Sequence, residues 1–319
     1  MIFFAQRDHW LAQADRSAAQ RAPLNGQFDV PRAMMWWMGV ALAVITVFGA
    51  ATAGAAPIGH PGIQRGAQAI QRPITPPKVP QGFPACEEGM ELQRDLPRTL
   101  GETIRYVVDV QGVSIGSIDF RVERAGTVEG VPVTEYRSLF RLDALVSSVI
   151  PVRGQAAAIV PVQQRAPIRA MNRYTMRKDR FEEVMSFRAG ASRVESARTK
   201  NGKNKEVKRN FAEPVRDFIS GFYMMRALPD DAKGCTVIYA NQRAYTIWFE
   251  HDGLESVKTP VGMRPARRYN VRYANERSKK VLEGKIWISD DDARLPYRMR
   301  VDGKASMDAQ IQSYSVAKH

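Results

Sequence analysis

Apolar and polar residues alternate along most of the chain from Gly101 onward. In the stretch TIRYVVDVQ (103–111), Ile104, Tyr106 and Val108 fall on one side of an extended chain and their neighbours on the other. A period of two is typical of β-strands that bury one face. The pattern recurs to the C-terminus, with turns such as Asn-Gly and Asp-Gly between the segments. It predicts a large antiparallel sheet with too many strands to stay flat, so we expect a half-barrel or a partly closed barrel.

One segment, PVRDFISGFYMMRALP (214–229), has a helical pattern instead. Phe218, Phe222 and Met225 recur along one stripe, and Asp217 suits the positive end of a helix dipole. The prolines at the two ends of the segment suit a first helical turn and a stop. The segment predicts one amphipathic helix that packs on the sheet.

The N-terminal region has the composition of an export signal. Residues 34–56 contain an apolar run that ends in small residues and has a basic residue before it. We expect 34–55 to be a signal peptide that is cut after Ala55, or 34–56 to remain as an inner-membrane anchor. Residues 1–33 are too long and too mixed for the start of such a signal, so either methionine at the head of the apolar segment is a candidate start. The sequence predicts an exported, periplasmic protein.

A proline-rich stretch and two cysteines define the start of the folded domain. The prolines of 56–85 exclude a helix or a central strand, so we expect an extended linker there and a domain over 86–319. Cys86 and Cys235 are the only cysteines of the chain. In an oxidising compartment this even number predicts a disulfide, and the alternative is two unpaired buried thiols.

Three consecutive aspartates, Asp290, Asp291 and Asp292, raise the question of a metal site. Calcium loops place their oxygen ligands at alternating positions and add a glycine and a distant bidentate carboxylate. Here the carboxylates are contiguous, and Arg294 follows closely. We interpret 290–294 as a hairpin turn in which the aspartates bind backbone amides and Arg294 balances their charge. No metal site is predicted.

Histidine, which many hydrolases and zinc sites require, is scarce. The chain has four histidines, and only His251, in a predicted turn between strands, lies within the expected domain and away from the chain end. No Gly-x-Ser-x-Gly elbow, phosphate loop or dinucleotide fingerprint is present. No cofactor is predicted, and a binding protein is favoured over an enzyme. The alternative is a hydrolase of unknown substrate that uses His251 or Glu102.

The chain carries a formal net charge of +14. A basic balance of this size favours anionic partners. The arginines and lysines are nevertheless dispersed along the predicted strands, as on a solvated surface. An alternative function is therefore an envelope scaffold that docks on anionic lipid or glycan. Nucleic acid is not expected as a partner of an exported protein.

Several short pieces of the sequence occur in an order that is similar to a known family. They are Gly101-Glu102 before a strand, Gly116 inside the next strand, Arg226 to Pro229 at the end of the aromatic helix, Ile286 to Asp291, and Arg294 to Pro296. From about Gly101 to Ser315 the chain resembles the bacterial exported family called domain of unknown function 3108 (DUF3108). The resemblance implies a periplasmic, mostly antiparallel β protein with no assigned activity. Its shape has a looser similarity to the half-barrel lipoprotein carriers of the Lol type.

A helix on a curled sheet offers a place for a lipophilic ligand. The candidate lining residues are Phe218, Phe222 and Met225 from the helix and Trp248 and Trp287 from the strands. The alternative is that these side chains are ordinary core, because so large a sheet must bury one face in any case. We expect a non-enzymatic binding protein of the cell envelope, with a lipid or a lipoprotein as its partner.

Overall fold

Fourteen β-strands form one antiparallel sheet in the part of the chain that the structure describes. The structure is a computed structural model, and it describes residues 86, 89–143, 146–147, 151–275, 281–303 and 305–317. The elements are β1 (Glu102–Val110), β2 (Val113–Val128), β3 (Val131–Leu142), β4 (Val152–Pro161), β5 (Arg169–Met176), β6 (Asp179–Arg188), β7 (Arg193–Lys200), β8 (Lys203–Asn210), α4 (Phe218–Met225), β9 (Lys233–Ala240), β10 (Arg243–Thr259), β11 (Gly262–Asn275), β12 (Leu282–Ser289), β13 (Pro296–Asp302) and β14 (Met307–Val316). The predicted mainly β fold with a helix is confirmed.

The predicted signal peptide (34–55) and linker (56–85) lie outside the described residues. Within the described residues, no helix is both long enough and apolar enough to cross a lipid bilayer.

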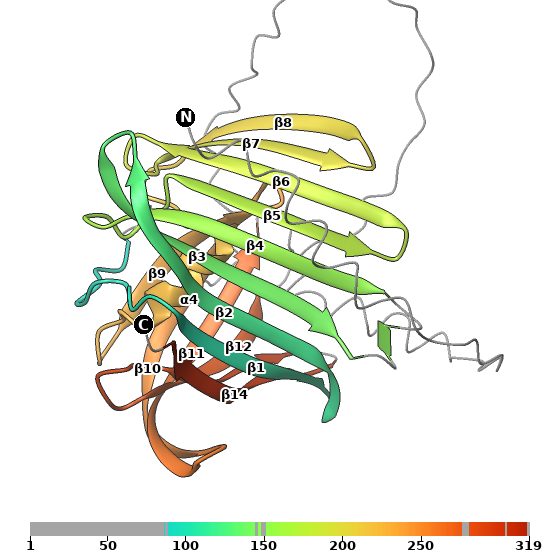
Figure 1. Cartoon of the computed structure of the whole chain (residues 1–319). Helices are drawn as coiled ribbons and strands as arrows, with labels where there is room; N and C mark the ends of the chain where they lie inside the picture. Colours follow the sequence, from blue (N-terminus) through green and yellow to red (C-terminus); the bar gives the residue numbers. More distant parts are fainter. Residues whose placement is uncertain are drawn as a thin grey trace, which may run out of the picture. The chain divides into compact units, whose positions relative to one another are not determined.

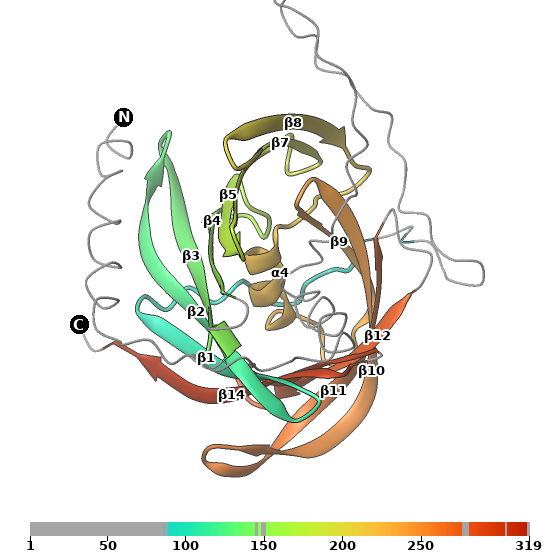
Figure 2. The same ribbon diagram turned by 90° about the vertical axis from the view of Figure 1, so that its right-hand side faces the viewer.

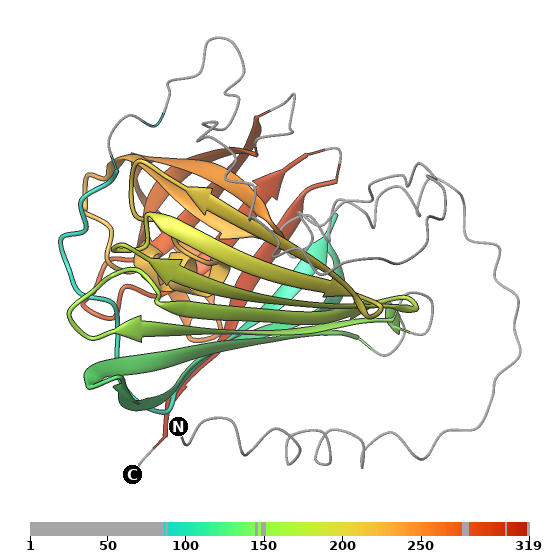
Figure 3. The same cartoon turned by 90° about the horizontal axis from the view of Figure 1, so that it is seen from above.

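The sheet is a continuous meander whose free edges come from the middle of the chain. Its strand order is β8-β7-β6-β5-β4-β3-β2-β1-β14-β13-β12-β11-β10-β9 (Figure 1). The first and last strands pair with each other, with Glu102 opposite Val316. Strands β8 and β9 are the two edges, and the sheet does not close between them. It curls around α4, which lies inside the curve in Figure 2, and Figure 3 shows the green-to-yellow strands on one side and the orange-to-red strands on the other.

Helix α4 begins at a buried aspartate. The carboxylate of Asp217 accepts hydrogen bonds from the backbone amides of Ile219 (2.8 Å) and Ser220 (3.1 Å). The first amides of a helix have no partner within the helix, and this N-cap satisfies two of them. The Ser220 hydroxyl lies within hydrogen-bond distance of the Asp217 amide, which completes a capping box. The cap fixes where the helix starts.

The predicted helix over 214–229 is too long at both ends. Before the helix, the Arg216 amide donates to the Val237 carbonyl (3.0 Å), and the Arg216 carbonyl accepts from the Tyr239 amide (2.7 Å). This pairing with β9 holds the segment extended, so its opening proline lies outside the helix. After Met225 the helix ends at Arg226, whose amide bonds to a carbonyl three residues back. Pairing with a neighbouring strand therefore outweighs the helical periodicity of the local sequence.

Helix α4 packs on the inner face of the sheet through aromatic side chains. Phe222 stacks on Phe120 of β2 with ring centroids 3.6 Å apart and meets Tyr106 of β1 edge-on at 5.9 Å. On its other side the helix approaches β9 closely at Gly221. A Cβ atom at this glycine would lie 2.5 Å from Cδ1 of Ile238, so a larger residue would require the end of the Ile238 side chain to move.

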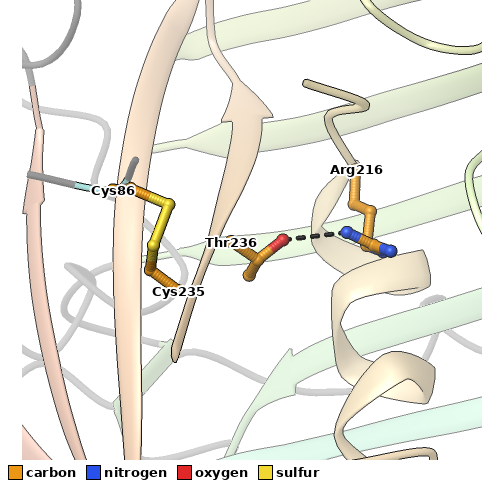
Figure 4. The surroundings of a disulfide bond; sticks show 4 residues. All are labelled: Cys86, Arg216, Cys235 and Thr236. Atoms are coloured by element: carbon orange, nitrogen blue, oxygen red, sulfur yellow. Dashed lines mark hydrogen bonds between the residues drawn. A yellow bond between two sulfur atoms is a disulfide. The ribbon is translucent and has the colours of Figure 1, made fainter. Parts of the chain in front are cut away.

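The predicted disulfide joins Cys86 to Cys235 near the start of β9 (Figure 4). Gly89 forms a parallel bridge with Cys235, and the Met90 amide donates to the Cys235 carbonyl (2.9 Å). The side chain of Trp248, on β10, packs in the same cluster. The segment before β1 therefore covers part of the edge of β9 that no strand pairs, which blocks pairing with another chain there.

A buried ion pair lies at the end of the sheet where α4 ends. The Arg226 guanidinium donates to the two carboxylate oxygens of Glu102, at 2.5 and 3.1 Å, and the side chains are only 4% and 2% exposed. Arg226 also donates to the carbonyl of Ala293, and the Tyr314 hydroxyl donates to Glu102 (3.3 Å). The pair ties the end of the helix to β1, β14 and the turn between β12 and β13.

Candidate functional site

An apolar cavity of about 280 Å³ lies between α4 and the inner face of the sheet. Both sides of the curled sheet contribute lining residues, for example Ile118 and Phe140 from β2 and β3, and Ile247 and Phe249 from β10. No Asp, Glu, His or Cys is among the lining residues that the structure describes. A space with such walls offers water few hydrogen bonds and suits an apolar occupant.

Small residues on β4 make room for this cavity. Gly154 and Ala156 lie on the inner face of the strand, and Gly154 stands between Phe140 of β3 and Tyr174 of β5. Side chains on a strand alternate between the two faces, so two small residues two positions apart leave one face hollow. The sequence GQAAA (154–158) is therefore the local signal for the cavity, and sequence reasoning did not use it.

The structure places three of the five candidate lining residues at the cavity. Phe218, Phe222 and Met225 of α4 form part of its wall. Trp248 and Trp287 are not part of the wall, and their placement there is corrected. Ile247 and Phe249 on either side of Trp248 face the cavity, as does Ile286 beside Trp287, so both tryptophans point to the outer face.

Each tryptophan has a partner on that outer face. Trp248 packs near the disulfide, against Cys235. The Trp287 indole donates a hydrogen bond to Glu255 (3.0 Å), and the Arg298 guanidinium lies 5.1 Å from its ring centre. Both side chains therefore serve packing on the outside of the sheet.

The described lining includes uncharged polar side chains, and its charged side chains are already paired. Arg173 and Arg300 belong to its lining, but their guanidinium groups pair with Glu182 (3.1 Å) and Asp302 (2.8 Å). The Tyr273 hydroxyl is buried and has no hydrogen-bond partner. Burial raises the pKa of Tyr273 to about 12, so the hydroxyl keeps its proton and can donate it to a hydrogen bond. A ligand with an uncharged acceptor group would satisfy it.

Glu183 on β6 bridges the seam between the two edges of the sheet. Its carboxylate accepts hydrogen bonds from the Ser196 hydroxyl (2.7 Å) and from the backbone amides of Asn241 (2.6 Å) and Gln242 (2.8 Å). These two amides belong to the turn between β9 and β10. The Gln242 side chain also donates to the Lys205 carbonyl on β8 (2.7 Å). Burial raises the pKa of Glu183, and these hydrogen bonds oppose the rise. The Glu183 side chain therefore fixes the β9–β10 turn against β6 and β7.

The amino-acid sequence of most of the described domain matches a known protein family. Residues 105–310 match the family described as "Protein of unknown function (DUF3108)". The chain belongs to this family. A comparison with functionally curated proteins finds no match for the DUF3108 chain.

Three solved structures are similar in fold to this DUF3108 chain. A β-barrel-like protein of domain of unknown function DUF1849 from Brucella abortus has a TM-score of 0.48 and 8% identity, over 69% of this chain and 99% of its own. An inferred exported protein with a YmcC-like fold from Bacteroides fragilis has a TM-score of 0.34 and 11% identity, over 69% and 98%. An inferred lipoprotein from Parabacteroides distasonis has a TM-score of 0.32 and 10% identity, over 69% and 97%.

The three aspartates of this DUF3108 protein form the turn between β12 and β13. One carboxylate oxygen of Asp291 accepts hydrogen bonds from the Ser289 hydroxyl (2.6 Å) and from the backbone amides of Ala293 (3.1 Å) and Arg294 (3.2 Å). An aspartate that binds amides two and three residues ahead is typical of a tight turn. Among the described residues, no three His, Cys, Asp or Glu side chains are placed to hold a metal ion.

Arg294 does not balance the charge of these aspartates, and that prediction was wrong. Its backbone φ is 49°, and its side chain is buried, where it donates to Asp230 (2.7 Å) and to the Leu228 carbonyl (2.8 Å). The aspartates face other cations, with Arg267 2.7 Å from Asp290 and Arg94 3.8 Å from Asp292. The left-handed backbone turns the side chain inward, which closeness in sequence did not reveal.

The residues of the hydrolase alternative lie away from the apolar cavity. Glu102 is held by Arg226, which leaves no free carboxylate for a general base. His251 lies edge-on to Tyr269 at 5.5 Å, and its Nε2 atom is buried without a hydrogen-bond partner. Glu102 borders a separate polar pocket of about 280 Å³ together with residues that include Arg94 and Tyr314. Neither Glu102 nor His251 lies in the wall of the apolar cavity that the structure describes.

Arginines on the outer face converge on one buried acid. Arg105 donates to Asp119 at 2.6 and 3.0 Å, Arg141 donates at 3.1 Å, and Arg121 lies 3.6 Å away. Burial alone would raise the pKa of Asp119, but the hydrogen bonds and charges of the arginines outweigh it and hold the pKa below its ordinary value of 3.8. One buried carboxylate therefore faces three guanidinium groups on the outer side of β1–β3.

Substituting Asp119 should reduce the dependence of the unfolding free energy on pH in the acidic range. A lowered native pKa contributes stability above the ordinary pKa, and this stability is lost as the pH falls through the native pKa. We expect Asp119→Asn to cost about 1–2 kcal/mol of unfolding free energy at neutral pH, because the partners are half exposed and screened. Urea unfolding over a pH series measures it. A difference from wild type that does not shrink below pH ~4 would contradict the assignment.

Proposed function

We propose that this DUF3108 protein is a non-enzymatic binding protein of the cell envelope that holds a lipophilic ligand between α4 and the sheet. The observation that carries the proposal is the apolar cavity, which has a helix for one wall and small residues on β4 for another. An envelope location is supported by the predicted export segment at 34–55 and by the disulfide between Cys86 and Cys235, which suits an oxidising compartment.

The size and polarity of the cavity define the ligand class. Sites for drug-sized ligands usually have about 300–1,000 Å³, so a cavity of about 280 Å³ suits one acyl chain better than a whole two-chain lipid. Among the described lining residues the charged side chains are paired, and the Tyr273 hydroxyl is a buried donor without a partner. A single-chain lipid with an ester or another neutral acceptor group matches both properties.

Filling the cavity from β4 should weaken binding without unfolding the protein. We expect Ala156→Phe to weaken binding of a fluorescent single-chain lipid ester by about tenfold or more, because the ring occupies space that the ligand needs, and tenfold corresponds to about 1.4 kcal/mol. Ala157→Phe is the matched control, since Ala157 is the next residue on the same strand and faces outward. Ala156→Leu is a milder variant if the larger ring disturbs folding.

Two results would overturn the proposal. One is a wild-type protein that releases no lipid on solvent extraction and does not bind the probe. The other is Ala156→Phe that folds, as judged by near-ultraviolet circular dichroism, and binds the probe as wild type does.

A further inference from the structure

The hairpin of β10 and β11 is longer than the strands on either side of it. Strand β9 pairs with β10 only as far as Glu250, and β12 pairs with β11 only from Ala266. The stretch 254–264 between these limits pairs within the hairpin. Figure 1 shows this orange arm extending past its neighbours at the lower end of the picture. Its base is anchored, because Val257 and Ala266 pack on Trp287.

The outer part of this arm exposes large apolar side chains. Val261 is 72% exposed and Met263 is 62% exposed near the tip, and Leu254, nearer the base, is 62% exposed. The tip is nevertheless well formed, since the Thr259 hydroxyl donates to the Gly262 carbonyl (2.8 Å) and accepts from the Val261 amide (3.3 Å). A structured arm that holds apolar groups in water is typical of a surface that meets a partner.

The charges around the tip select the kind of partner. Lys258 and Arg264 are exposed, stand on β10 and β11 beside the tip, and have no ion pair among the described residues. No acidic residue occurs in 256–266. The acids at the base of the arm, Asp252 and Glu255, are already paired with an arginine of β11. The tip thus combines apolar groups with two uncompensated positive charges.

We propose that this arm, 254–264, docks the protein on an anionic lipid bilayer. Val261 and Met263 enter the interfacial region, while Lys258 and Arg264 contact the anionic headgroups. The apolar side chains suit the acyl boundary of the bilayer, and the basic side chains suit its anionic headgroups. Each basic residue near the surface raises the affinity about fivefold. This inference does not depend on the cavity, because the arm lies outside it.

A fluorescent label at the tip of the arm tests the proposal in the full chain, because the label reports the surroundings of the tip itself. Cys86 and Cys235 are bonded to each other, so Val261→Cys provides a free thiol for an environment-sensitive fluorophore. Val113→Cys is the matched control, because Val113 is similarly exposed (64%) and lies at the opposite end of the sheet. Vesicles of phosphatidylcholine with phosphatidylglycerol are compared with vesicles of phosphatidylcholine alone.

We expect a blue shift of the label at position 261 with anionic vesicles only. Adding Lys258→Gln and Arg264→Gln should reduce the equilibrium for insertion by about 30-fold, and high salt should reverse the shift. An unchanged emission spectrum of the label at position 261 would overturn the proposal. A protein would then be the better candidate for the partner of the arm. An equal shift at position 113, or a shift that the two glutamines leave intact, would overturn it as well.

Discussion

Arg226→Met should destabilise the folded domain by about 3–5 kcal/mol, because it leaves a carboxylate buried without its counter-charge. The Glu102 side chain is 2% exposed, and the arginine supplies both of its short hydrogen bonds. The remaining donor, the Tyr314 hydroxyl at 3.3 Å, cannot replace a cation. Urea unfolding followed by circular dichroism measures the loss.

Two further variants separate the buried charge from the lost packing. Combining Arg226→Met with Glu102→Gln removes the unpaired charge and should recover a large part of the stability. Arg300→Met is the exposed control, since Arg300 and Asp302 are 42% and 43% exposed and such pairs contribute about 0–1 kcal/mol. If Arg226→Met stays within about 1 kcal/mol of wild type, the pair is not the buried tie described here.

Removing the disulfide should lower the unfolding free energy by about as much as Arg226→Met does, because the unfolded chain then gains conformational freedom. Cys86 and Cys235 are 149 residues apart, and closing a loop of that length is worth about 5 kcal/mol in the chain-entropy model. Measured values are often smaller, so we expect Cys86→Ser with Cys235→Ser to cost roughly 3–5 kcal/mol.

Reduction of the wild-type protein gives an independent measurement of the same quantity. Urea unfolding with and without dithiothreitol should reproduce the difference between wild type and the double serine variant, and dithiothreitol should not affect the variant. Trp248 packs against Cys235, so its fluorescence reports the local change. A loss below about 1 kcal/mol would mean that the covalent link does not constrain the unfolded chain.

The period of two predicted the sheet and the antiparallel fold because it follows from backbone geometry alone. It could not assign the faces of Trp248 and Trp287. Trp248 lies between Ile247 and Phe249, and all three are apolar, so the sequence does not tell which face meets the helix. That choice depends on how the whole sheet curls, which is a property of tertiary packing.

Other parts of the site depended on contacts between distant segments. The helix starts later than its pattern predicted because Arg216 pairs with β9. Arg294 binds Asp230, 64 residues away, although three aspartates precede it directly. The signal for the cavity was present in the sequence as small residues at 154 and 156, but its meaning depends on the helix that stands opposite.

The pairing of β1 with β14 has a consequence for the order of folding. Within each half of the sheet, β1–β8 and β9–β14, strands that are neighbours in sequence can pair as hairpins. The two halves join only when β14 pairs with β1. Contacts between residues so far apart form slowly. If the chain emerges with its N-terminus first, the free edge of β1 stays unpaired until β14 is complete. Unpaired strand edges of this kind are prone to aggregation.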